Sequence, residues 1–233
     1  MTNILLDSIN FCRRYARELF SIMGPVIIAM AILSNVADLF TYQYYWVGLV
    51  YALVSMVLQT YFLVRLIRFF HSVVSGVAYK HSVSFSDWID LLSVSILYGL
   101  AVVIGSMALI IPGVFFAAKY GFSTFETVLN DKGAIAAMSA SWRKSRGFTG
   151  KMMLGSGLIV LLTILLTLPL AYLQEASFVI RFTGGILIEL ISSVLMLFTM
   201  VFYFRVYTLA DKSVVGSEHK GSAELDSRIS GEE

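Results

Sequence analysis

Residues 91–118 read LLSVSILYGLAVVIGSMALIIPGVFFAA, a stretch of 28 residues without Asp, Glu, Lys or Arg. A membrane-spanning helix needs about 20 apolar residues, so this stretch is too long for one span. Near its end lies Ile111-Pro112-Gly113, and a proline followed by a glycine ends a helix and turns the chain. The sequence therefore predicts a helix-breaking turn at Pro112 and Gly113, with one span ending near Ile110 and the next beginning near Val114.

Four further stretches are long enough to span a membrane and have at most one Asp, Glu, Lys or Arg. They are residues 19–37, 39–64, 152–174 and 182–204, the last interrupted only by Glu189. With residues 114–130 they bring the predicted spans to six. The composition agrees, because 58% of the 233 residues are hydrophobic and only 14% are charged, against about a quarter charged in soluble domains. We expect an all-α polytopic membrane helical bundle of about six transmembrane helices plus interfacial amphipathic helices.

The basic residues give an independent test of this topology, because cytoplasmic loops collect Lys and Arg. With the N-terminus inside, 15 of the 17 Lys and Arg residues fall in inner segments. The exceptions are Arg181, in an outer connection, and Lys119, within a span. A five-span arrangement without a crossing at 114–130 would place a basic cluster outside: Arg143, Lys144, Arg146 and Lys151. We therefore reject it and expect both termini to be cytoplasmic.

Two segments have the pattern of helices that lie on the membrane surface. In residues 1–20, apolar positions recur at helical spacing, at Leu5, Ile9, Cys12, Ala16 and Leu19. This pattern predicts an interfacial amphipathic helix on the inner leaflet. A second such helix is expected at 134–145, with Trp142 as an interfacial anchor at headgroup depth. A basic rim flanks its end: Arg143, Lys144 and Arg146.

The chain thus divides into the interfacial helix at 1–20, a six-span domain at 21–210 and a tail at 211–233. The tail holds six acidic residues, three basic residues and five serines, and it has no aromatic residue. A segment of this composition cannot bury a core, so we expect it to be disordered and cytoplasmic.

Charges inside spans are the sharpest functional signals in such a chain, because each costs about 2.5–3.5 kcal/mol at a helix centre. Lys119, Ser123 and Glu126 form one polar stripe on the predicted fourth helix. Glu126 is about one turn from the inner end, where we expect a rim acid that reaches water. On the sixth helix Glu189 lies within a face of small residues, between Gly185 and Ser193. Both faces should point into the bundle.

Lys119 and Glu189 have matching depths in the six-span arrangement. Each lies roughly 9 Å from the outer end of its helix, at 1.5 Å per residue. We therefore predict an intramembrane ion pair between them. Three interpretations stay open: the pair only locks two helices together, it belongs to a ligand, ion or proton site, or the two side chains do not touch.

Catalytic and cofactor signatures give no support for an enzyme. The one cysteine and three histidines lack metal-ligand spacing, and no nucleotide-binding, zinc-protease or nucleophile-elbow motif is present. We expect no catalytic residues, no metal, no cofactor and no nucleic acid. The basic residues are already accounted for by topology.

Several stretches carry a resemblance to a known family. They are residues 111–119 (IPGVFFAAK), 129–133 (LNDKG), 136–147 (AAMSASWRKSRG) and 201–207 (VFYFRVY). In these motifs the chain resembles the YciC-like bacterial inner-membrane proteins, and it is similar to the membrane domain attached to some glycerophosphodiester phosphodiesterases. The resemblance implies a helical bundle in the bacterial inner membrane. It does not extend to the phosphodiesterase activity, because we find no such domain.

We expect a non-enzymatic integral inner-membrane protein that organises lipids or partner proteins in the envelope. Its partners would be anionic headgroups at the inner leaflet, and another inner-membrane protein or a second copy of the chain. The alternative is a small transporter or channel that uses Lys119, Glu126 and Glu189. A transporter should show a hydrated cavity that reaches these charges, whereas an organising protein should show them paired and sealed.

Overall fold

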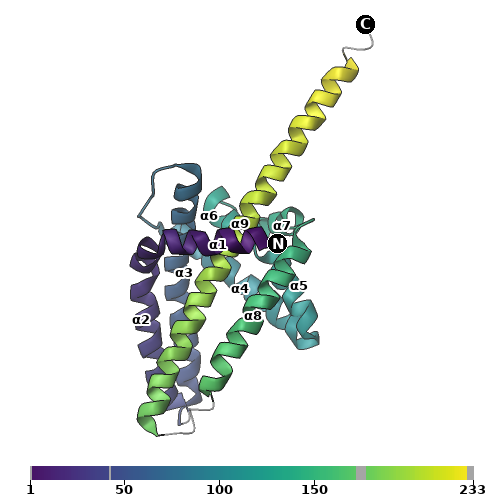
Figure 1. The fold of residues 1–233 in the computed structure, drawn as a ribbon. Helices are drawn as coiled ribbons and strands as arrows, with labels where there is room; N and C mark the ends of the chain where they lie inside the picture. Colours follow the sequence, from purple (N-terminus) through teal and green to yellow (C-terminus); the bar gives the residue numbers. More distant parts are fainter. Residues whose placement is uncertain (1, 42, 172–176, 230–233) are drawn as a thin grey trace.

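A computed structural model describes residues 2–41, 43–171 and 177–229 (Figure 1). In these ranges every regular element is a helix, joined by loops, with no strand. The helices are α1 (Thr2–Arg14), α2 (Ala16–Thr41), α3 (Tyr45–Ser75), α4 (Phe85–Ala108), α5 (Ile110–Tyr120), α6 (Ser123–Asn130), α7 (Ala134–Lys144), α8 (Thr149–Ala171) and α9 (Phe178–Ile229). The predicted all-α fold class is confirmed.

Five helices in the described ranges are long and apolar enough to cross a membrane: α2, α3, α4, α8 and α9. They correspond to five of the six predicted spans. The sixth prediction, a single crossing at 114–130, is wrong, because this segment forms the short helices α5 and α6.

Gly121 lies at the break between α5 and α6. A Cβ atom on Gly121 would lie 2.0 Å from Cε1 of Tyr203, so only glycine lets the chain pass this close to α9. The chain nevertheless returns toward its starting side through these two helices. In Figure 1, α7 lies at the same end of the bundle as α1, and Lys144 of α7 bonds Asp211 of α9 there. The basic cluster at 143–151 is therefore at the end where the six-span arrangement placed it.

The predicted helix-breaking turn also shifts slightly. The helix breaks at Leu109, and Pro112 lies in the first turn of α5, where a missing N–H is tolerated. Gly113 serves instead for close approach, because a Cβ there would lie 3.0 Å from Cα of Ser106 on α4. A Cβ on Gly105 would lie 2.6 Å from the Phe116 ring. These two glycines allow α4 and α5 to pack as a tight hairpin.

α1 lies across the end of the bundle (Figure 1), as an interfacial helix would. It ends at Arg14, and its buried face differs from the predicted stripe. Ser8 and Phe11 are buried, whereas Ile9 is exposed. The Phe11 ring packs edge-on against Phe70 of α3, with centroids 5.7 Å apart. Packing on the bundle, rather than apolar spacing alone, sets the rotation of α1.

α7 coincides with the second predicted surface helix to within one residue at its end. Ala137 and Ser141 are buried and Trp142 is half-buried, so these residues form the inward face of α7.

The segment from Asp211 to Ile229, within the tail predicted to be disordered, is continuous with α9. α9 continues as a helix to Ile229 and projects away from the bundle (Figure 1). The last proline of the chain is Pro169, so no ring interrupts the hydrogen-bond ladder of α9. Residues 230–233 of the predicted tail lie outside the described residues.

Aromatic side chains form the centre of the core. Four phenylalanines from different parts of the chain are fully buried: Phe70, Phe122, Phe125 and Phe202. They hold α3, α6 and α9 together near the end where α1 and α7 lie, which fixes the positions of the polar side chains described next.

Candidate functional site

The structure separates the three intramembrane charges predicted from the sequence. Four ion pairs occur among the described residues: Arg68–Asp87, Lys132–Glu126, Lys144–Glu126 and Lys144–Asp211. The predicted pair of Lys119 with Glu189 is not among them. The depth argument assumed one straight helix from Pro112 to Asn130, whereas the turn at Gly121 directs Lys119 toward α7.

Lys119 is covered by aromatic rings. Its side chain is buried, with the ammonium nitrogen 5.1 Å from the centre of the Trp142 ring and 5.9 Å from that of Phe115. The negative face of an aromatic ring attracts a cation and partly replaces its water. Trp142, predicted as an interfacial anchor, therefore has a second role as a cover for Lys119.

Glu126 is the most completely bonded charge in the described part of the chain. Its side chain is 1% exposed, so it is not the water-reaching rim acid expected from the sequence. Oε1 lies 2.7 Å from the Lys144 ammonium and accepts a 3.2 Å hydrogen bond from Tyr207. Oε2 accepts hydrogen bonds of 2.6 Å from Lys132 and 2.9 Å from Asn130. Ser123 of the predicted polar stripe is also buried, and its hydroxyl donates to the Tyr120 carbonyl.

Lys144 extends these contacts to the end of α9. Its ammonium donates a 2.8 Å hydrogen bond to Asp211 and lies 4.1 Å from the centre of the Tyr207 ring. We call these residues the Glu126 cluster: Glu126, Asn130, Lys132, Lys144, Tyr207 and Asp211. Arg143 and Arg146, the other members of the predicted basic rim, are exposed. The cluster joins α6, α7 and α9.

The cluster holds its charges in their ionised forms. Burial raises the pKa of Glu126, but hydrogen bonds from Lys132, Lys144 and Asn130 outweigh it and lower the pKa to about 2. Burial lowers the pKa of Lys144, and the bonds to Asp211 and Glu126 outweigh it, so the net shift is upward. Neither group exchanges a proton near neutral pH, which suits a structural tie better than acid–base chemistry.

This shift predicts an acid-dependent loss of stability. The pKa of Glu126 is lower in the fold than its ordinary value of 4.5, so its contribution is present above that value and is lost as the pH falls toward 2. The shift corresponds to about 3 kcal/mol. Thermal unfolding in detergent checks it. The difference in Tm between the wild type and Glu126→Gln should be constant above about pH 5 and shrink below it. A difference that does not change with pH would contradict the assignment.

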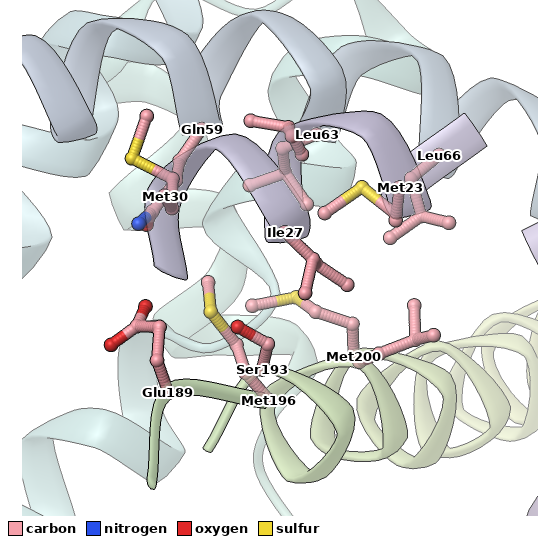
Figure 2. Close-up of a pocket in the computed structure, with 12 residues that line it drawn as sticks. Met23, Ile27, Met30, Gln59, Leu63, Leu66, Glu189, Ser193, Met196 and Met200 are labelled. Atoms are coloured by element: carbon pink, nitrogen blue, oxygen red, sulfur yellow. The ribbon is translucent and has the colours of Figure 1, made fainter. Parts of the chain in front are cut away.

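Glu189 lies in a different place, at a cavity between α2, α3 and α9 (Figure 2). The cavity of about 40 Å³ has room for about two or three water molecules. Its lining is mostly apolar and includes three polar side chains, Gln59, Glu189 and Ser193. The apolar lining residues are Met23, Val26, Ile27, Met30, Leu63, Leu66, Met196, Leu197 and Met200. Among the described residues the Glu189 carboxylate has no hydrogen bond or ion pair.

The small-residue face around Glu189 points into the bundle, as predicted. A Cβ on Gly185 would lie 2.0 Å from Oδ1 of Asn35 on α2, so this glycine is needed for the contact of α9 with α2. Ser193 lines the same cavity as Glu189. Neither Lys119 nor Glu126 lines this cavity.

Sequence reasoning missed four members of the Glu126 cluster: Asn130, Lys132, Tyr207 and Asp211. Tyr207 belongs to one of the stretches that carry the family resemblance, but nothing in its spacing connects it to Glu126. Metal binding has no geometric basis in the described ranges, where no three His, Cys, Asp or Glu side chains lie together as ion ligands.

Long apolar helices, packed side by side with charges held between them, define a multi-pass helical membrane protein. Comparisons of the chain with family models, curated proteins and solved structures gave no match. The similarity to the YciC-like proteins therefore stays a prediction from the motifs.

Proposed function

We propose that this is a non-enzymatic protein of the bacterial inner membrane that organises lipids or partner membrane proteins. The observation that carries the proposal is that the three charges lie apart in the described part of the chain, with only Glu189 at the cavity between α2, α3 and α9. Glu126 is bonded on both oxygens, and Lys119 is covered by Trp142 and Phe115. A transport route needs connected polar groups that water or substrate can reach.

The ends and sides of the molecule support contact with lipid. α1 and α7 lie at one end of the bundle (Figure 1), and exposed basic side chains accompany both: Arg13, Arg14, Arg143 and Arg146. Basic residues near a membrane surface attract anionic headgroups, at about 1 kcal/mol for each suitably placed side chain. Exposed leucines along the long helices, such as Leu53, Leu161 and Leu165, suit acyl chains.

Two measurements on the full chain test this proposal together. Native mass spectrometry after gentle extraction should show retained lipids or a partner protein at a defined ratio. Vesicles that contain the protein should be no more permeable to ions and protons than protein-free vesicles. Ion or proton flux through the reconstituted protein, with no retained lipid or partner, would overturn the proposal.

One observation favours the alternative of a small transporter. The Glu189 carboxylate lines a cavity between spanning helices and lacks a bonded partner in the described part of the chain. An acid in this position suits a proton or a small cation. Proton uptake into vesicles tests it with Glu189→Gln, and with Glu18→Gln, an exposed acid on α2, as the control. Flux that is lost only in Glu189→Gln would establish the alternative.

A further inference from the structure

We propose that α1, α3 and α9 form a binding site for the phosphodiester of an anionic phospholipid, with Arg14 and Arg205 as its ligands. The inference rests on the proposed function and names the lipid class that the protein would hold. It comes from a pocket that is separate from the Glu189 cavity and the Glu126 cluster.

The pocket has a volume of about 370 Å³ and lies beneath α1. It is lined by Asp7, Asn10, Phe11, Arg14, Tyr15, Val73, Val74 and Arg205. The polar residues come mostly from α1, and the two valines come from the end of α3. Because α1 lies across the end of the bundle (Figure 1), this combination of charged and apolar lining suits the junction of a headgroup with its acyl chains.

Arg205 provides the strongest sign of a missing ligand. Its Nε is buried and has no hydrogen-bond partner among the described residues. The guanidinium carbon lies 5.1 Å from the centre of the Phe11 ring, which holds the group in one orientation. A guanidinium has five N–H donors in a fixed fork that matches two phosphate oxygens. No side-chain hydrogen bond or ion pair of Arg205 occurs among the described residues, so the guanidinium can bind an anion in the pocket that it lines.

The charges that face the pocket define the ligand further. Arg14 and Arg205 contribute two positive charges and Asp7 one negative charge. None of the three forms an ion pair within the described ranges. The net charge of +1 matches a lipid whose phosphodiester carries one negative charge with no compensating amine. Asn10 and Tyr15 add neutral hydrogen-bonding groups for the ester or glycerol oxygens.

Aromatic packing keeps the site formed without a ligand. Phe11 contacts Phe70 of α3, and Tyr15 contacts Phe69 with ring centres 6.0 Å apart. These contacts fix α1 on α3 and α9, so little ordering is required when a headgroup binds.

The test is lipid retention by the full-length protein in nanodiscs that contain phosphatidylglycerol and phosphatidylethanolamine, read by native mass spectrometry. Arg205→Gln and Arg14→Gln should each lower the affinity for phosphatidylglycerol by about tenfold or more, since hydrogen bonds to charged groups contribute about 1.5–3 kcal/mol. Arg13→Gln is the matched control, because Arg13 is adjacent on α1, exposed and outside the pocket. Arg205→Lys keeps the positive charge but loses the forked guanidinium donors. Its affinity for phosphatidylglycerol should therefore lie between those of the wild type and Arg205→Gln.

Arg14 is exposed, so Arg14→Gln tests the site even if Arg205→Gln fails to fold. Retention of phosphatidylglycerol equal to wild type in Arg14→Gln and in folded Arg205 variants would overturn the site and leave the proposed function standing. A wild type that retains no anionic lipid would overturn the site, whereas the proposed function would survive on a partner protein. Equal competition by soluble glycerol 3-phosphate would show that a free phosphate, and not a lipid, is the ligand.

Discussion

Replacement of Glu126 by glutamine is expected to lower the free energy of unfolding by about 3–5 kcal/mol, because it breaks a buried ion-pair network: Lys132 loses its carboxylate partner and the half-buried Lys144 loses one of two. The carboxylate contacts the ammonium groups of Lys132 and Lys144 at 2.6 and 2.7 Å. A glutamine amide keeps the shape of the side chain, but it removes the negative charge. It also places an N–H donor against the N–H donors that surround the carboxylate. The contacts that join α6, α7 and α9 should weaken together.

The measurement is the Tm of the purified protein in one detergent, where a loss of this size should lower the Tm by on the order of 10 °C. Asp131→Asn is the matched control, because Asp131 is an exposed acid near the cluster and asparagine tolerates its left-handed backbone, with φ of 48°. Addition of Lys132→Met to Glu126→Gln should recover part of the loss, because Glu126 is the only bonded partner of Lys132 among the described residues, whereas Lys144 keeps Asp211. If Glu126→Gln changes the Tm no more than the control does, the cluster is not a structural tie.

Gly155→Ala is expected to lower the free energy of unfolding by about 2 kcal/mol through overpacking. A Cβ on Gly155 of α8 would lie 2.2 Å from Cζ of Phe202 on α9. Phe202 is fully buried, so its ring cannot rotate away without displacing its neighbours. The two helices would have to separate.

Gly157→Ala provides the control on the same helix. No atom lies within 4 Å of the position that its Cβ would take, and alanine favours a helix over glycine by about 1 kcal/mol. The two variants share this gain, so their difference isolates the clash with Phe202. Thermal unfolding of both in the same detergent measures it. Equal Tm values would mean that α8 and α9 do not approach each other as closely as Gly155 indicates.

The long spans were predictable because lipid imposes a simple rule on every exposed position of a spanning helix. Windows without charge located α2, α3, α4 and α8, and a window with the single charge of Glu189 located α9. The rule fails at 114–130, where Lys119 and Glu126 are buried by protein rather than exposed to lipid. At the break Gly121 lies against Tyr203, a contact across more than 80 residues of sequence that no local pattern reveals.

The charged residues were identified from the sequence, but their partners were not. Glu126 bonds Tyr207, which is 81 residues away, and the predicted partner of Glu189 instead lies against Trp142. Helical spacing determines which residues share a face, but not which helix that face meets. For Glu189 the face was correct, since Gly185 and Ser193 both point into the bundle. For Lys119 the prediction assumed one continuous helix at 114–130, and it therefore named Glu189 as the neighbour instead of Trp142.

The continuity of α9 has a mechanical consequence. One unbroken helix carries Glu189 at the cavity, Arg205 in the pocket beneath α1, and Tyr207 and Asp211 in the Glu126 cluster. A helix transmits axial displacement and torque along its length, so a rotation of α9 would move all these groups at once. Beyond Asp211 the same helix extends for 18 residues to Ile229, about 27 Å at 1.5 Å per residue. Its projecting end is therefore a lever arm, and a force applied to it from outside the bundle would reach the polar groups that α9 carries.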